Sequence, residues 1–140
     1  MLKKILFPVD GSEYSKRAIN TVSELANKFN AEVILLHCHY IPVQYSPYYV
    51  PNLELEKDIL DMGKNILKDA NEELEKAGIH PVNLLKEGNT GPMIIKIAEE
   101  ENCDSIIMGF RGLGAIGSML SGSVSNYVIH HTKLPVMLIH

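Results

Sequence analysis

The chain has 140 residues, a length typical of one domain that buries a core without disulfides or a structural metal. Its net charge of −4 disfavours nucleic acid and anionic membranes as partners, and no apolar run is long enough to span a bilayer. The two cysteines, Cys38 and Cys103, lack the spacing of a metal site or a disulfide framework. We therefore expect a single domain over residues 1–140, in the cytoplasm.

Short apolar strands alternate with amphipathic helices along the chain, which is typical of a parallel sheet covered by helices on both faces. The five expected strands are 4–9, 32–37, 81–85, 103–108 and 135–139. The expected helices are 12–29, 53–77, 92–101 and 123–132. Right-handed crossovers then favour a doubly wound, Rossmann-like α/β fold, for which we predict the strand order 3-2-1-4-5.

The stretch 38–52, between the second strand and the second helix, is predicted to be a long loop. It contains three prolines, which exclude a regular helix, and four tyrosines. Loops of this length in compact domains are usually functional or disordered, and the tyrosines favour a contact surface. We expect a protein partner of unknown identity to bind here.

A glycine-rich stretch between the fourth strand and the last helix is the best evidence for a phosphate site. Two residues separate Gly109 from Gly112, and nine separate Gly112 from Gly122, which precedes Ser123. Glycines bring backbone N–H groups close to an anion, and a helix N-terminus offers unpaired N–H donors. The hydroxyl of Ser123 could donate to a phosphate oxygen or simply cap the helix.

Two better-known phosphate motifs are excluded in this stretch. A Walker A loop requires a lysine directly before its serine, and no lysine lies between Gly109 and Ser123. Residues 112–117 match the dinucleotide fingerprint formally, but the βαβ unit and the acidic residue that should follow are missing. We interpret that match as a coincidence.

Asp10 follows the first strand, and ligands of doubly wound sheets bind at the carboxyl ends of the strands. Its carboxylate could help to hold a divalent cation that accompanies the phosphates, or accept a hydrogen bond from a sugar hydroxyl. The alternative is a cap for the helix that begins at Ser12. Both roles remain open from the sequence.

Residues 3–12, 33–37 and 134–136, together with the spaced glycines at 109, 112 and 122, resemble the universal stress protein family over the whole chain. The glycine pattern is similar to that of its ATP-binding members. The resemblance implies an ATP ligand accompanied by Mg²⁺ or Mn²⁺, with Asp10 near the ribose or the metal and the Cys38 backbone at the adenine edge. Its implied nucleotide-binding residues are Pro8, Val9, Asp10, Cys38, Met108, Gly109, Arg111, Gly112, Gly122, Ser123 and Val124. Phe110 stands where the family usually has a small polar residue.

The last strand is apolar and is expected at an edge of the sheet, where its backbone groups would be unpaired. It comprises Val136, Met137, Leu138 and Ile139. A two-fold homodimer would pair this edge, and the family resemblance implies the same; the alternative is an edge covered by a loop or by the terminus.

Three functions remain open from the sequence. The favoured one is an ATP-binding stress-response or signalling module with slow or no hydrolysis, because no base or Walker lysine is evident. The second is a metal-dependent ATP hydrolase or nucleotidyl or phosphoryl transferase, and the third is a nucleotide-free interaction module. His37 and His39 alternate on one strand, but without a third ligand they more simply form local hydrogen bonds.

Overall fold

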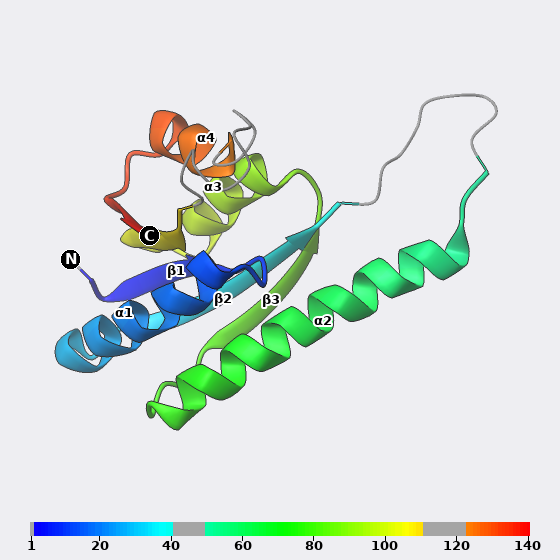
Figure 1. The fold of residues 1–140 in the computed structure, drawn as a ribbon. Coiled ribbons are helices and arrows are strands. Elements are labelled where there is room, and N and C mark those ends of the chain that lie inside the picture. The colour runs from blue at the N-terminus through cyan, green and yellow to red at the C-terminus, as the bar shows by residue number, and fades with distance from the viewer. Residues whose placement is uncertain (1, 41–49, 111–122) are drawn as a thin grey trace.

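The computed structural model describes residues 2–40, 50–110 and 123–140, in which strands and helices alternate as the sequence predicts (Figure 1). The strands are β1 (Lys4–Pro8), β2 (Glu32–His39), β3 (Val82–Glu87), β4 (Ser105–Gly109) and β5 (Val136–Ile139). The helices are α1 (Glu13–Phe29), α2 (Leu53–Lys76), α3 (Thr90–Glu100) and α4 (Ser123–His131). No helix in these ranges is both long and apolar enough to cross a bilayer.

The five strands form one parallel sheet in the order β3-β2-β1-β4-β5, which confirms the predicted doubly wound topology. In the register of β1 and β2, Lys4 lies opposite Glu32, and its ammonium lies 3.6 Å from that carboxylate. The chain runs outward from β1 to β3 and then returns to β4 on the other side of β1. The carboxyl ends of β1 and β4 therefore flank the point where the strand order reverses, which is where such sheets bind ligands.

Helices cover both faces of the sheet, with α1 and α2 on one side and α3 and α4 on the other (Figure 1). Successive strand residues point to opposite faces, so each strand contributes to two apolar clusters. On β1, Ile5 and Phe7 pack in the cluster with α1 and α2, whereas Leu6 packs in the cluster with α3 and α4. These three side chains are fully buried.

Several element ends differ from the sequence prediction. β2 continues to His39, because its polar end still pairs with β3, where Cys38 lies opposite Lys86. α3 begins at Thr90 instead of Pro92, which places the proline inside the first turn, where a backbone N–H has no partner within the helix. Phe29 at the end of α1 is apolar yet 48% exposed, because the buried face of this helix ends one turn earlier at Ala26.

Candidate ligand-binding site

A cavity of about 230 Å³ opens at the carboxyl ends of β1 and β4, where the strand order reverses. It is lined by Pro8, Val9, Asp10, Ser15, Leu36, Cys38, Thr90, Ile94, Met108, Gly109, Ser123, Val124 and Ser125. Its volume lies below the roughly 300–1,000 Å³ range of small-molecule sites. The walls come from strands and from the first turns of α1, α3 and α4.

Most of the sequence-predicted ligand residues lie together on these walls. They are Pro8, Val9, Asp10, Cys38, Met108, Gly109, Ser123 and Val124. The other three, Arg111, Gly112 and Gly122, lie outside the described residues, as do positions 41–49 of the predicted partner loop. The structure gives these side chains a common location, and their contact with a nucleotide stays a prediction.

Asp10 shapes the turn between β1 and α1. Its Oδ1 accepts a hydrogen bond from the Ser12 N–H at 2.9 Å. Ser12 is the N-cap of α1, and its Oγ accepts from the Ser15 N–H at 3.2 Å. The alternative that Asp10 itself caps the helix is therefore wrong, because that position belongs to Ser12.

The close approach of α1 to the end of β4 explains the glycine at position 109. A Cβ atom there would lie 2.6 Å from both the backbone N of Ser15 and the carbonyl C of Tyr14. A side chain cannot be accommodated at this distance unless the backbone moves. Gly109 thus lets the first turn of α1 reach the cavity, which places Ser15, only 4% exposed, on its wall.

The cavity has an apolar side and a hydroxyl-rich side. Leu36, Ile94 and Met108 are buried and contribute the apolar side. Hydroxyl groups come from Ser15, Thr90, Ser123 and Ser125. This arrangement suits a ligand with a flat apolar ring at one end and sugar or anionic oxygens at the other.

Sequence reasoning missed five residues of this wall: Ser15, Leu36, Thr90, Ile94 and Ser125. Thr90 follows the carboxyl end of β3 and Ser125 follows Ser123 by two positions, so the edge of the sheet could have indicated both. Leu36 and Ile94 carry no signal that separates them from ordinary core residues. Ser123 is the first residue of α4, so its hydroxyl belongs to the first helical turn.

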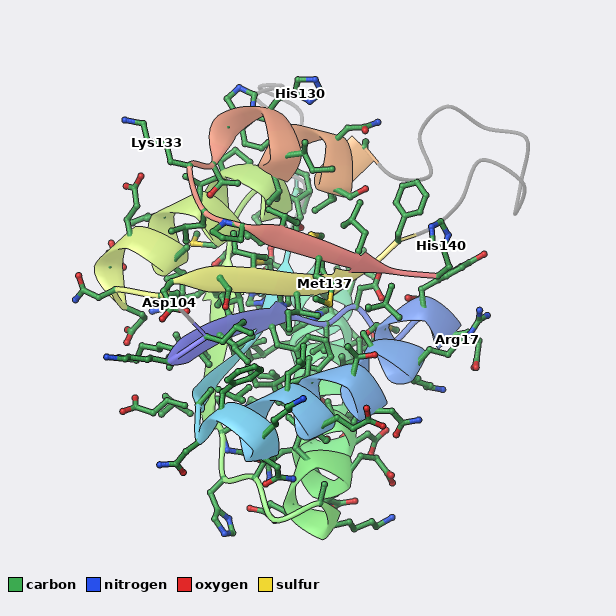
Figure 2. All side chains as sticks on the ribbon, turned by 90° about the vertical axis from the view of Figure 1, so that its left-hand side faces the viewer. Arg17, Asp104, His130, Lys133, Met137 and His140 are labelled. Atoms are coloured by element: carbon green, nitrogen blue, oxygen red, sulfur yellow. The ribbon has the colours of Figure 1, made fainter. Side chains whose placement is uncertain are left out.

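Phe110 and His37 are engaged in local contacts, whereas the buried Nδ1 of His39 has no hydrogen-bond partner among the described residues. The Phe110 ring packs edge-to-face on His140, labelled in Figure 2, with 4.9 Å between the ring centroids. Phe110 is not among the residues that line the cavity.

His37 Nδ1 lies 2.7 Å from the carbonyl oxygen of Val9. Within the described ranges no three His, Cys, Asp or Glu side chains are grouped as a metal site would need.

Cys38 is expected to be a slow nucleophile although it borders the cavity. Burial raises the pKa of its thiol from 9.0 to about 11, which favours the uncharged form. Because the thiolate is the reactive form, alkylation by iodoacetamide at pH 8 should be on the order of 100-fold slower than for a free cysteine. Mass spectrometry of timed samples measures this rate, and the same protein unfolded in urea is the control. A folded-state rate equal to the unfolded one would contradict the prediction.

A parallel doubly wound sheet with a cavity at the switch point defines the class of α/β proteins with Rossmann-like topology. Within that class, the model of the universal stress protein family matches residues 1–140, and the chain belongs to this family. A universal stress protein of Methanothermobacter thermautotrophicus is 33% identical, with 99% of this chain and 96% of that protein covered.

Two solved structures have the same fold as this chain. The structure of the hypothetical protein MJ0577 of Methanocaldococcus jannaschii has a TM-score of 0.82 at 31% identity, covering 99% of this chain and 96% of that one. A universal stress protein family member from Arabidopsis thaliana, described with AMP bound, has a TM-score of 0.73 at 21% identity, covering 98% and 90%.

Proposed function

We propose that this chain is an ATP-binding module whose nucleotide state changes its conformation or its partners, with slow or no hydrolysis. The observation that carries the proposal is the cavity at the switch point, which collects eight of the predicted nucleotide residues from β1 and the turn after it, from β2, from β4 and from α4. The Arabidopsis protein with AMP, which shares the fold, supports an adenine nucleotide as the ligand. The free thiols Cys38 and Cys103 suit the reducing cytoplasm.

The chemistry of the walls fits the parts of such a ligand. Leu36, Ile94 and Met108 would contact the adenine ring, and the hydroxyl groups would bind ribose and phosphate oxygens. The N-terminus of α4 at Ser123 would favour the phosphate charge. Asp10 would help to hold Mg²⁺ or Mn²⁺, since such ions take one or two carboxylates besides the phosphates. The ion would neutralise phosphate charge.

The side chains described on the walls support slow hydrolysis. Asp10 is the single charged group among the described lining residues, and its carboxylate already accepts the Ser12 N–H. Phosphoryl transfer needs cationic groups that stabilise the negative charge of the transferred group, and a residue that orients the attacking water. Among the described wall residues, neither a lysine nor an arginine supplies that charge.

Calorimetric titration of nucleotide-free protein with ATP and Mg²⁺ tests the proposal. We expect one ATP per chain, retained intact, and roughly tenfold weaker binding for Asp10→Asn, equivalent to about 1.4 kcal/mol. Glu24→Asn is the control, because Glu24 is exposed on α1 and does not line the cavity. Absence of binding at millimolar ATP would overturn the proposal. Steady ADP release that is lost in Asp10→Asn, with ATP still bound, would favour the hydrolase instead.

We also propose a homodimer through β5. This strand is at the edge of the sheet, and Met137, labelled in Figure 2, is 41% exposed. Antiparallel pairing of β5 from two copies would provide hydrogen-bond partners for the backbone N–H and C=O groups at this edge and would cover the Met137 side chain.

Met137→Lys should weaken dimerisation at least tenfold, because an ammonium would be buried against the second copy. Analytical ultracentrifugation over a concentration series measures the effect. Ile129→Lys on α4 is the matched control, since Ile129 is 45% exposed and lies outside β5. Equal weakening by both variants would argue against β5 as the interface.

A further inference from the structure

A second cavity, of about 530 Å³, lies between α1 and α2 and has no role in the function proposed above. We call it the α1–α2 groove. It is lined by Val9, Gly11, Ser15, Lys16, Ile19, Asn20, Ile66, Asp69, Ala70, Glu72 and Glu73. Both helices lie on the same face of the sheet (Figure 1), so the groove is a feature of that helical layer.

The groove combines an apolar floor with an acidic wall. Val9, Ile19 and Ala70 are buried and belong to the core cluster beneath the two helices. Asp69 and Glu73 are exposed and lie one helical turn apart on α2, which corresponds to a rise of about 6 Å. A ligand here would meet carboxylates at the rim and apolar side chains below.

The charges of the groove are unbalanced. Three carboxylates line it, from Asp69, Glu72 and Glu73, against the single ammonium of Lys16. Lys16 lies 3.5 Å from Glu13, outside the groove, and Glu73 lies 2.7 Å from Lys76. In the part of the chain that the structure describes, neither Asp69 nor Glu72 forms a salt bridge. The rim therefore favours a cationic ligand.

The groove and the nucleotide cavity share walls. Val9 and Ser15 line both of them, and Gly11 lies between these two residues in the chain. A Cβ at Gly11 would lie 3.1 Å from Ile66 Cγ1, so the turn that carries Asp10 packs directly on α2. A ligand that moves this turn would change the shape of both cavities.

We propose that the α1–α2 groove docks a peptide segment of a partner protein in which arginine or lysine alternates with apolar residues. Its cationic groups bind Asp69 and Glu72, the two carboxylates of the groove that form no salt bridge within the described residues, and its apolar side chains contact Ile19 and Ile66. Nucleotide occupancy changes the affinity for this segment, because the turn from Val9 to Ser15 belongs to both sites. This second part rests on the proposed function.

The docking itself is tested on the full chain without nucleotide. The probe is a fluorescent peptide with three Arg-Leu repeats, and fluorescence anisotropy measures its binding. We expect the double variant Asp69→Asn with Glu72→Gln to bind at least tenfold more weakly. The matched control is Glu24→Gln with Glu99→Gln, which removes two exposed carboxylates outside the groove. Thermal melting verifies that both variants are folded.

Equal weakening by the two double variants would overturn the docking, because it would indicate attraction by overall charge. Equal affinity for a peptide of three Glu-Leu repeats would also overturn it. Displacement of the peptide by spermidine at the same molar affinity would assign the groove to free polyamines and contradict a peptide partner.

The coupling is tested with protein loaded with ATP and freed of excess nucleotide by gel filtration, so that ATP does not bind the peptide in solution. We expect the peptide affinity to differ at least fivefold between loaded and empty protein, and ATP affinity to change by the same factor when peptide is present. Equal affinities in the two states would overturn the coupling. Failure of ATP to bind would overturn the proposed function, whereas docking is measured separately on the empty protein.

Discussion

Gly109→Ala should lower the free energy of unfolding by about 3 kcal/mol, the upper end of the usual cost of overpacking. The added methyl group would lie 2.6 Å from backbone atoms of Tyr14 and Ser15, which cannot rotate away as a side chain would. Either β4 or the first turn of α1 must move. For a chain of this size the melting temperature should fall by about 10 °C, measured by circular dichroism.

Gly78→Ala is the control for this substitution. Gly78 has a φ of +82° but open space around its Cβ position, so the cost there is backbone strain alone, about 1 kcal/mol. A melting temperature of Gly109→Ala equal to that of the unsubstituted protein would contradict the close approach. Loss of ATP binding without loss of stability would instead make Gly109 a ligand contact only.

Cys38→Trp should abolish nucleotide binding, with at least a 100-fold loss of ATP affinity, and leave the fold intact. Cys38 is half-buried at the end of β2 and lines a cavity of only about 230 Å³, much of which an indole would occupy. Tryptophan is well tolerated in strands, so the sheet should form normally. Calorimetry with ATP and Mg²⁺ measures the affinity, and circular dichroism checks the fold.

Cys38→Ser separates cavity volume from thiol chemistry. Serine keeps the space open, so ATP affinity should change by less than about threefold, an energy of roughly 0.7 kcal/mol. A folded Cys38→Trp variant that binds ATP normally would place the nucleotide elsewhere. A large loss in Cys38→Ser would give the thiol a direct role in binding.

The order of strands and helices was predictable because strands of a parallel sheet that are buried on both faces consist of nearly continuous apolar residues. Apolar runs such as Ile5–Val9 mark strands that are covered on both sides, and amphipathic stretches between them mark the helices. Element ends were less predictable. The second strand was expected to end at His37, yet β2 continues to His39, because backbone pairing with Glu87 on β3 does not depend on side-chain polarity.

The site residues that follow from the fold topology could be predicted from the sequence. The site residues that depend on side-chain and helix packing could not. Asp10 follows the end of β1 and Ser123 begins α4 at the same edge of the sheet, so topology alone places them together. Ile94 joins them through the packing of α3 against the sheet, which no local sequence pattern indicates. The 2.6 Å approach behind Gly109 is likewise invisible in sequence, where the glycine suggested only a phosphate loop.

The cavity also has a mechanical consequence, because its walls come from both helical layers. Ser15 belongs to α1 on one face of the sheet, and Thr90 and Ser125 belong to α3 and α4 on the other. A molecule bound there would contact both helical layers, whose apolar clusters lie on opposite faces of the sheet. At a ligand concentration of 100 times Kd this adds about 2.7 kcal/mol to the stability of the whole domain. A ligand in this small cavity would therefore stabilise the packing of α1 and α2 on one face of the sheet and of α3 and α4 on the other.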